Sequence, residues 1–399
     1  MNIKSISFEN YKAFIEKQTI QIKPITILIG KNSSGKSSIA KLFTLFENSL
    51  SGEIEEPLLV SNHGVSLGAD FRDLVSKRDA SPVSFGIEYQ NGMSLDVSIF
   101  KKDPTQYNLD IQKWRFNHLS LTLTTENYYI DSENKKYDCA FKGFIPTKIL
   151  LDEYECTKEL HLDILKIDVD YIGPFRILPE RIFYLSGEIN YKNTGIKGEN
   201  AYAMLGSSMR IGSDLYKKVS EWYEKKFDGW KLIVKDNFPY VEVVLTKDNN
   251  EVNIVDVGQG MNQALPLVVR ANTSNRQNSM IILEQPELHL HPAAHGDLAE
   301  LFVQSAMDNQ QTYIIETHSE NFLLRLRNLV IKNPYGFTKD DVIIYWIENA
   351  EIEGQELREI TIDDEGELSD WPEGVFNENL KEISQMRASI KEKRNDNRI

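Results

Sequence analysis

One short segment of the chain has the residue types and the spacing of a phosphate-binding loop. Residues 30–37 read Gly-Lys-Asn-Ser-Ser-Gly-Lys-Ser and fit the pattern GxxxxGK[ST]. Glycines let backbone N–H groups turn inward around phosphate oxygens, Lys36 can reach the β- and γ-phosphates, and the Ser37 hydroxyl can bind Mg²⁺. We therefore predict a nucleotide site whose contacts include Gly30, Lys31, Asn32, Ser33, Ser34, Gly35, Lys36, Ser37 and Ser38.

The segments on either side of this loop have the patterns of the elements that should position it. Residues 25–29 form a continuous β-branched and apolar run, which is typical of a strand buried on both faces. Residues 37–46 place Ile39, Leu42, Phe43 and Phe46 at helical spacing. The unit is thus strand, loop and helix, and the helix N-terminus would add positive potential beneath the phosphates.

A second segment could supply the acidic support for a metal ion. Residues 280–283 form an apolar strand that ends at Glu284, a carboxylate suited to Mg²⁺. Gln285 follows directly, and its neutral amide can orient a water molecule but cannot accept its proton. Glu287 is therefore the alternative candidate for the base of a hydrolytic reaction.

The rest of the chain divides into regions of different pattern. Alternating apolar and polar residues predict strands at 2–8 and 18–22 and an antiparallel β layer over 82–141, whereas 160–231 favours helices and 230–257 strands. The last third alternates helices at 261–270, 293–307 and 321–330 with strands at 280–283, 312–315 and 342–347, the pattern of a parallel sheet covered by helices. From Phe376 the spacing predicts an amphipathic helix, whose apolar seam could be core or a docking face.

Composition restricts the class of protein without identifying its partners. The chain has 399 residues, 45 basic and 60 acidic side chains, a net charge of −15 and only two cysteines, Cys139 and Cys156. This argues against a disulfide framework and a cysteine-based metal site, and favours a reducing compartment. The N-terminus is interrupted by charges, and no apolar run approaches a membrane span of about 20 residues, so we expect a cytoplasmic protein. The acidic balance argues against general attraction to nucleic acid.

Several motifs together resemble one family. The segment EQPELHLHP at 284–292 resembles the Walker B strand and following loop of ATP-binding-cassette (ABC)-type AAA ATPases in the OLD, RecF and SMC-like group. Residues 313–319, YIIETHS, are similar to the strand and switch histidine of those enzymes. Residues 257–266 resemble their signature segment, and YIGPFR at 171–176 also recurs in the group.

The resemblance implies an α/β fold: a P-loop NTPase of the ABC-type ATPase head, with an antiparallel β layer, a helical lobe and a mostly parallel core sheet. We expect an N-terminal ATPase lobe at 1–145, a helical and signature lobe at 146–260, a C-terminal ATPase lobe at 261–350 and a tail at 351–399. The tail residues 370–376, DWPEGVF, resemble the WPxGF-type tail of a subgroup of these ATPases.

The resemblance also implies a head-to-tail dimer, or a higher oligomer, around two molecules of Mg·ATP. The signature residues Gly258, Gln259, Gly260 and Asn262 would contact ATP bound to the loop of the other subunit, and Lys12 would approach the nucleotide. Ser37 and Glu284 would hold Mg²⁺. Glu287, Gln285 and His318 are the candidate catalytic residues, with His318 holding the γ-phosphate or the attacking water.

The histidines in and beside the EQPELHLHP motif, and a group of lysines elsewhere, allow other interpretations. His289, His291 and His295 could bind zinc, but their place in the HLHP loop favours packing. A lysine-rich stretch with interleaved tryptophan and tyrosine could bind nucleic acid, but its glutamates favour a charged amphipathic helix; its basic residues are Lys217, Lys218, Lys225, Lys226 and Lys231.

We expect a switch that controls a separately encoded effector in bacterial anti-phage defence, because the ATPase motifs are complete while long coiled-coil arms and room for a Toprim nuclease are absent. A RecF-like DNA-binding repair ATPase is the main alternative. A transporter's ATPase subunit and a small-molecule kinase fit the motifs less well. Nucleic acid thus stays a possible partner, and we expect no contact with a membrane.

Overall fold

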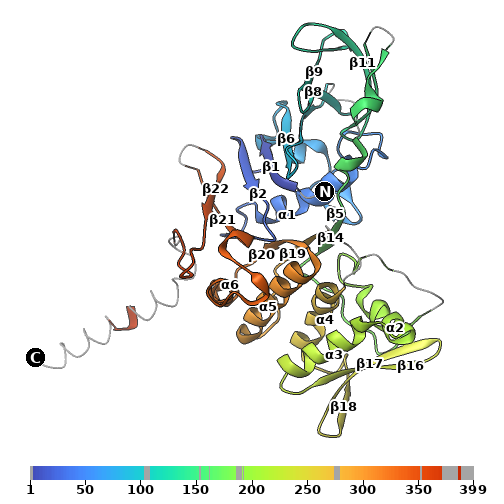
Figure 1. Cartoon of the computed structure of the whole chain (residues 1–399), viewed down its shortest axis with the longest axis vertical. Helices are drawn as coiled ribbons and strands as arrows, with labels where there is room; N and C mark the ends of the chain where they lie inside the picture. The colour runs from blue at the N-terminus through green and yellow to red at the C-terminus, as the bar shows by residue number, and fades with distance from the viewer. Residues whose placement is uncertain are drawn as a thin grey trace, which may run out of the picture.

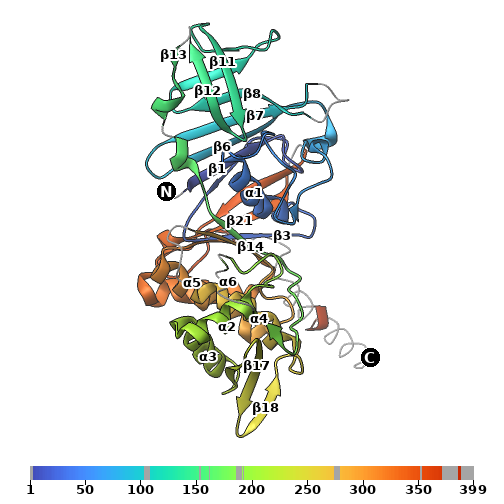
Figure 2. The same ribbon diagram turned by 90° about the vertical axis from the view of Figure 1, so that its right-hand side faces the viewer.

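The computed structural model describes residues 3–102, 108–151, 154–160, 162–185, 191, 193–273, 279–350, 353–370 and 385–387. Figure 1 shows an elongated molecule in which an antiparallel sheet, a central sheet and a lobe of helices follow one another along the longest axis. Figure 2 shows helix α1 (Lys36–Ser49), which begins at the phosphate loop, between the two larger sheets. The loop therefore lies near the middle of the molecule.

Ten strands form the antiparallel sheet, in the order β13-β12-β11-β10-β9-β8-β7-β6-β1-β2. The burial of residues in β7 alternates along the strand, so one face packs on a core and the other meets solvent. The predicted β layer at 82–141 is confirmed, and the sheet also recruits the two N-terminal strands. Its members are β1 (Ile3–Glu9), β2 (Gln18–Gln21), β6 (Val83–Tyr89), β7 (Ser94–Phe100), β8 (Asp110–Phe116), β9 (Leu119–Leu123), β10 (Tyr129–Ile130), β11 (Lys136–Lys142), β12 (Ile145–Leu151) and β13 (Tyr154–Glu155).

The central sheet brings the phosphate loop and the Walker B-like strand together. Its order is β14-β19-β20-β3-β21-β22, and all neighbours pair in parallel except β21 and β22. The mostly parallel core sheet predicted from the sequence is confirmed. Its strands are β3 (Ile25–Gly30), β14 (Val169–Ile172), β19 (Met280–Glu284), β20 (Thr312–Glu316), β21 (Val342–Asn349) and β22 (Gln355–Ile360).

Both faces of the central sheet are buried, because successive residues of a strand point to opposite sides. In β19, Met280 and Ile282 belong to the hydrophobic core that contains α1. Ile281 and Leu283 belong to the opposite core, with the helices α4 (Gln259–Asn272), α5 (Pro292–Asn309) and α6 (Glu320–Lys332). Each fully buried Ile or Leu contributes roughly 1.5–3 kcal/mol, which fixes the sheet rigidly beneath the loop.

The third part of the molecule is a small sheet packed on two helices. It contains α2 (Ala201–Ile211), α3 (Asp214–Lys226), β15 (Phe183–Tyr184), β16 (Lys231–Asn237), β17 (Tyr240–Lys247) and β18 (Asn250–Asn253). The prediction that helices dominate residues 160–231 is wrong for its first half. The described residues between 160 and 200 contain the strands β14 and β15 and a 3-10 turn, η4 (Leu162–Leu165). The buried strand β14 was missed because its sequence, VDYI, contains a charged residue.

The remaining elements are short. They are β4 (Ser61–Asn62), β5 (Val65–Ser66) and the 3-10 turns η1 (Phe71–Asp73), η2 (Ser76–Arg78), η3 (Thr157–Leu160), η5 (Pro334–Gly336) and η6 (Lys339–Asp341). Within the tail, residues 371–384 and 388–399 lie outside the described residues. The WPxGF-type segment is therefore described only at Asp370. The predicted amphipathic helix is described only at 385–387, and these three residues are helical. None of the helices in the described ranges is long and apolar enough to cross a membrane.

Candidate nucleotide-binding site

The phosphate loop connects the end of β3 to the start of α1. Gly30 has a φ of +154°, and a Cβ added there would lie 2.8 Å from the Ile347 carbonyl oxygen and from Ser34 Oγ, so the position requires glycine. The Lys36 side chain lies over the loop, where Nζ donates to the carbonyls of Gly30 at 3.1 Å and Lys31 at 2.7 Å. Burial lowers the pKa of Lys36. A lysine enclosed by loop backbone at a helix N-terminus forms an anion-binding site.

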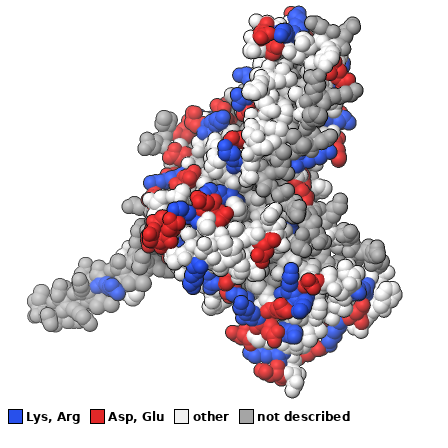
Figure 3. Space-filling view, in the orientation of Figure 1, with Lys and Arg blue, Asp and Glu red and all other residues white. Residues whose placement is uncertain are grey.

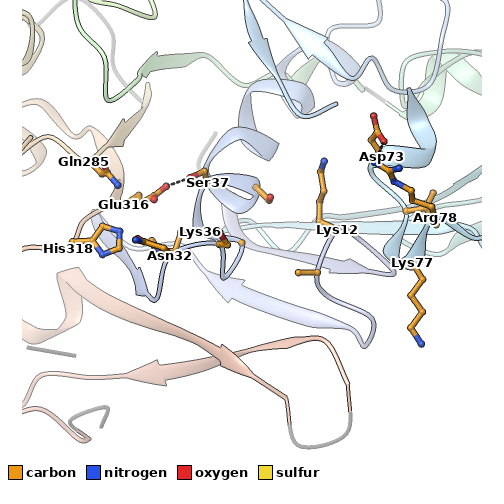
Figure 4. Close-up of a pocket in the computed structure, with 15 residues that line it drawn as sticks. Lys12, Asn32, Lys36, Ser37, Asp73, Lys77, Arg78, Gln285, Glu316 and His318 are labelled. Atoms are coloured by element: carbon orange, nitrogen blue, oxygen red, sulfur yellow. Dashed lines mark hydrogen bonds and ion pairs between the residues drawn. The ribbon is translucent and has the colours of Figure 1, made fainter. Parts of the chain in front are cut away.

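A cavity of about 540 Å³ opens over this loop (Figure 4). The predicted site residues that line it are Lys12, Asn32, Ser33, Gly35, Lys36, Ser37, Ser38, Gln285 and His318. The lining residues that the sequence did not predict are Ala13, Asp73, Val75, Lys77, Arg78 and Glu316. Glu284 and Glu287 lie on the adjoining segments but are not among the described residues that line the cavity. Tertiary structure thus brings the loop, the switch histidine and Gln285 to one cavity.

The central polar contact of the cavity joins Ser37 to Glu316. The Ser37 hydroxyl donates a hydrogen bond of 2.7 Å to Glu316 Oε2. Glu316 is the last residue of β20 and is only 4% exposed. Burial raises its pKa, while the hydrogen bond from Ser37 and the charges of Lys36 and Lys41 lower it. Sequence reasoning missed this carboxylate, although the apolar run Tyr313–Ile315 before it has the same strand-then-acid pattern as Glu284.

The predicted metal ligand Glu284 lies at the same level on the neighbouring strand. It pairs with Glu316 in the register of β19 and β20. Its carboxylate is 4.0 Å from Lys41 Nζ, and the Tyr171 hydroxyl lies close enough to influence its pKa. Burial raises the pKa of Glu284 to about 7; Lys41 opposes this and the charge of Glu316 adds to it. The site therefore holds two buried carboxylates with two lysines beside them.

The two candidate bases take different positions. Gln285 lines the cavity, and its backbone N–H donates to the Glu316 carbonyl at 2.8 Å. Glu287 is buried, and its Oε1 accepts hydrogen bonds from Thr317 Oγ1 at 2.8 Å and from the His318 N–H at 2.7 Å. Glu287 thus contacts the loop after β20 through Thr317 and His318, whereas Gln285 faces the cavity.

His318 lines the cavity on the same side as Glu316 and Gln285 (Figure 4). Burial lowers the pKa of its imidazole, and the nearby charge of Lys36 lowers it further. A neutral ring carries one donor and one acceptor nitrogen. His318 can therefore hydrogen-bond a phosphate oxygen or a water molecule, as predicted for a switch histidine.

The opposite wall of the cavity is basic. Figure 4 shows Lys12, Lys77 and Arg78 on the side of the loop away from His318. Arg78 Nη2 lies 2.9 Å from Asp73 Oδ1, and Lys12 Nζ donates to a backbone carbonyl. Lys77 and Arg78 have φ values of 55° and 57°, a conformation that costs a non-glycine residue about 1–3 kcal/mol and clusters at functional sites. Lys12, which was predicted to approach the nucleotide, lines the cavity, whereas nothing in the sequence pattern marked Lys77 or Arg78.

The signature segment lies apart from this cavity. Gly258 is the N-cap of α4, and Gly258 and Gln259 are exposed. None of the described residues 257–262 lines the cavity. Asn262 is only 3% exposed, so its side chain does not lie at the surface where a contact across an interface would form. The exposed start of α4 offers unpaired backbone N–H groups, which suit an anion.

The three histidines in and after the HLHP loop differ in their surroundings, since His289 and His291 are exposed and His295 lies partly buried in α5. His295 Nδ1 shares a 2.7 Å hydrogen bond with Ser319 Oγ, and its Nε2 lies 3.2 Å from the Leu290 carbonyl. His291 caps α5 by accepting from the Ala293 N–H. Among the described residues, no group of three or more His, Cys, Asp or Glu could hold a metal ion. The hydrogen bonds of His291 and His295 are those of structural residues, and the packing interpretation for His289 stays a prediction.

The lysine-rich helix α3 does not form a surface of one sign. Lys226 Nζ is 2.6 Å from Asp297 and 3.3 Å from Glu300, and Lys231 lies 4.0 Å from Glu224. Figure 3 shows basic and acidic side chains intermixed on this part of the molecule. The observed helix agrees with the charged amphipathic interpretation.

Comparisons with known proteins agree with this geometry. The fold resembles an SMC head bound to the C-terminal winged-helix domain of ScpA, with 12% identity, a TM-score of 0.50 and coverage of 90% of this chain and 98% of that one. An SMC head domain from Thermotoga maritima matches with 9% identity and a TM-score of 0.43, covering 90% of this chain and 98% of that one. An SMC head domain with an extended coiled coil, derived from Pyrococcus furiosus, matches with 11% identity and a TM-score of 0.41, covering 97% of this chain and 99% of that one.

No curated protein matches the sequence. Residues 338–386 match a family described as a protein of unknown function, DUF3696. Residues 1–237 and 208–323 match the AAA ATPase domain family. The fold is thus similar to that of an SMC head. The two segments that match the AAA ATPase domain family together cover well over half of the chain, so the protein belongs to that family.

Proposed function

We propose that the chain is an ATP-driven molecular switch, in which two copies assemble head to tail around Mg·ATP and hydrolyse it. One observation carries this proposal. The cavity gathers the phosphate loop, Glu316 and His318, yet none of the described residues 257–262 at the exposed start of α4 lines it. A signature segment that faces solvent is available to complete the cavity of a second copy.

The residues of the cavity fit Mg·ATP. Lys36 and the loop N–H groups would hold the β- and γ-phosphates. Mg²⁺ prefers oxygen ligands, and the Ser37 hydroxyl with the carboxylates of Glu316 and Glu284 supplies them. When bound, the ion would neutralise phosphate charge.

For hydrolysis, the residues divide into orienting and supporting groups. Gln285 and His318 would orient water and the γ-phosphate, because both line the cavity. Glu287 would fix the backbone of His318 through its hydrogen bond. A neutral Gln285 predicts slow turnover, because no proton can be accepted there. A slow step suits a switch whose output depends on the lifetime of the ATP-bound assembly.

We further propose that the assembled form controls a separate effector protein in anti-phage defence. The resemblance of the EQPELHLHP and YIIETHS segments to OLD-like ATPases supports this assignment. One structural neighbour is an SMC head bound to ScpA, and a separate protein partner is proposed here as well. Plating efficiency of phage on cells carrying the wild-type gene with its neighbouring genes should be lower than that on cells carrying Lys36→Ala, and equal efficiencies would argue against the defence role.

The head-to-tail arrangement can be tested by mixing two inactive variants. Gly258 is exposed and a Cβ there meets nothing within 4 Å, so Gly258→Arg should fold normally while blocking close approach of a second copy. Lys36→Ala removes the phosphate-binding lysine. Each variant alone should lose ATP-dependent mass increase in light scattering and ATP hydrolysis in a phosphate-release assay.

The mixture should recover hydrolysis, because one of its two composite sites combines an intact loop with an intact signature segment. Normal turnover by Gly258→Arg alone would exclude the sandwich mechanism. Mixing at several ratios is the internal control, since recovery should peak near equal amounts of the two variants.

A further inference from the structure

The contact between Ser37 and Glu316 points to Glu316 for the metal-supporting role that the Walker B-like residue Glu284 would ordinarily take. Ser37 is the loop residue whose hydroxyl is suited to bind Mg²⁺. Its hydroxyl donates at 2.7 Å to Glu316 Oε2, as the dashed line in Figure 4 shows. An acceptor on the hydroxyl hydrogen turns the oxygen lone pairs of Ser37 toward the cavity.

Sheet order explains why Glu316 is the closer carboxylate. Strand β20 lies between β3, which leads into the loop, and β19, which ends at Glu284. Neighbouring strands are about 4.8 Å apart, so Glu284 sits one strand spacing farther from the loop than its register partner Glu316. Glu284 is also not among the described residues that line the cavity, whereas Glu316 is.

The surroundings of Glu316 suit a bound cation. Its side chain is almost fully buried and lines the cavity, and a buried carboxylate is costly without a cation or several hydrogen-bond donors. Lys36 and Lys41 lie near enough to affect its charge, but Lys36 Nζ is occupied by the carbonyls of Gly30 and Lys31. A hard divalent ion at Ser37 would meet this need.

We propose that Glu316, more than Glu284, is the acidic residue that holds Mg²⁺ beside Ser37 in this protein. The inference rests on the proposed function, because it concerns the metal that accompanies ATP. Glu316 keeps the Ser37 hydroxyl oriented and offers carboxylate oxygen to the ion or to its water. Glu284 then supports the site from the next strand through its charge.

The test measures Mg²⁺ dependence of nucleotide binding, without turnover. Fluorescent mant-ATP is titrated into the full chain in EDTA and at increasing Mg²⁺, for the wild type, Glu316→Gln and Glu284→Gln. In EDTA, Glu316→Gln should bind mant-ATP as tightly as the wild type or more tightly, because a negative charge near the phosphates is gone. The Mg²⁺ concentration that gives half of the affinity gain should rise about 10- to 100-fold, the usual effect of losing a group that supports a metal ligand.

Glu284→Gln should raise the required Mg²⁺ concentration less than Glu316→Gln does. An equal or larger effect of Glu284→Gln, or an unchanged requirement in Glu316→Gln, would overturn the assignment. Glu316→Asp, which keeps the charge on a shorter side chain, should restore part of the Mg²⁺ response and so exclude general misfolding as the cause. Glu348→Gln, which alters a carboxylate on β21 that accepts from Trp346, is the matched control and should behave as the wild type.

A separate result would report on the proposed function itself. Wild-type protein that binds no mant-ATP in either condition would refute nucleotide binding and this inference with it. Binding by the wild type with the requirement for Mg²⁺ unchanged in Glu316→Gln would refute only the assignment of Glu316.

Discussion

The backbone N–H of His318 donates a 2.7 Å hydrogen bond to the carboxylate of Glu287, which lies 31 residues earlier in the chain. The same oxygen accepts from the Thr317 hydroxyl at 2.8 Å. Glu287 thus ties the loop after β19 to the loop after β20. This contact supports the proposal that Glu287 acts in hydrolysis by positioning His318 and not by accepting a proton.

The two roles of Glu287 predict different mutant kinetics. If it positions His318, Glu287→Gln should retain most of the ATPase rate, because the amide oxygen can still accept the two hydrogen bonds. Glu287→Ala should lower the ATPase rate at least about tenfold, since a misplaced His318 would weaken catalysis. The rates of phosphate release of the two variants distinguish the positioning role from the role of base. Loss of activity as complete in Glu287→Gln as in Glu287→Ala would instead mark Glu287 as the base.

The imidazole of His318 should titrate below the usual range of histidine. Burial disfavours the imidazolium and the charge of Lys36 adds to this effect, so the pKa is lowered. A bound γ-phosphate would favour the charged ring and raise the pKa, and by linkage protonation of His318 would then strengthen ATP binding as the pH falls. NMR titration of the ring Hε1 signal with and without a non-hydrolysable ATP analogue measures both changes.

Lys36→Met offers the control for this titration. Removing the lysine charge should raise the His318 pKa toward its ordinary value without nucleotide. A His318 pKa that neither the analogue nor Lys36→Met changes would contradict the placement of His318 beside the phosphate site.

The helix that carries the signature segment is anchored by one buried ion pair. Arg270 Nε lies 2.6 Å from Asp170 Oδ2 on β14, and both side chains are nearly inaccessible. Asp170→Asn would leave the Arg270 charge uncompensated, and breaking such a buried pair typically costs about 3–5 kcal/mol. We expect a clear fall in melting temperature by differential scanning calorimetry.

The exposed pair Arg181–Asp256, with both side chains about half accessible, is the matched control. Asp256→Asn should change the melting temperature little, because water and salt screen exposed charges. Equal effects of Asp170→Asn and Asp256→Asn would show that the buried pair does not anchor α4.

The basic wall of the cavity should contribute to nucleotide affinity. Lys77 and Arg78 line the cavity, and their charges are partly balanced by ion pairs, with Lys77 Nζ 2.7 Å from Glu353 and Arg78 Nη2 2.9 Å from Asp73. Lys77→Ala and Arg78→Ala should each weaken mant-ATP binding several-fold, and the loss should shrink at high salt because charges outside a dry interior are screened. Arg72→Ala is the control, since Arg72 lies in the same segment and does not line the cavity. Unchanged affinity in both wall variants would limit the site to the phosphate loop.

Local pattern was enough to predict the phosphate loop and most of the core sheet. The helices at 37–46 and 293–307 follow the helical spacing of apolar residues, and the apolar runs at 25–29 and 280–283 are too short for a helix and rich in isoleucine. They appear as β3, β19, α1 and α5 within a few residues of the expected bounds. The nucleotide contacts near Lys36 follow directly, because a strand, a glycine-rich loop and a helix are contiguous in sequence.

The local sequence pattern could not predict strand β14 or the basic wall of the cavity. Asp170 interrupts the apolar run of β14, and its burial is tolerable only because Arg270, a hundred residues later, neutralises it. Lys77 and Arg78 sit in a segment with no periodic signal, and residue type does not predict their left-handed backbone, since neither is glycine or asparagine.

The sequence by itself determined that this protein has a phosphate loop, a following helix and acid-ended buried strands, because those features depend on neighbouring residues alone. Only the tertiary structure decided which acid meets Ser37, because strand order is set by how hydrophobic faces pack. By placing β20 between β3 and β19, the fold brings Glu316 to the serine hydroxyl, leaves Glu284 on the next strand and turns Glu287 toward the backbone of His318.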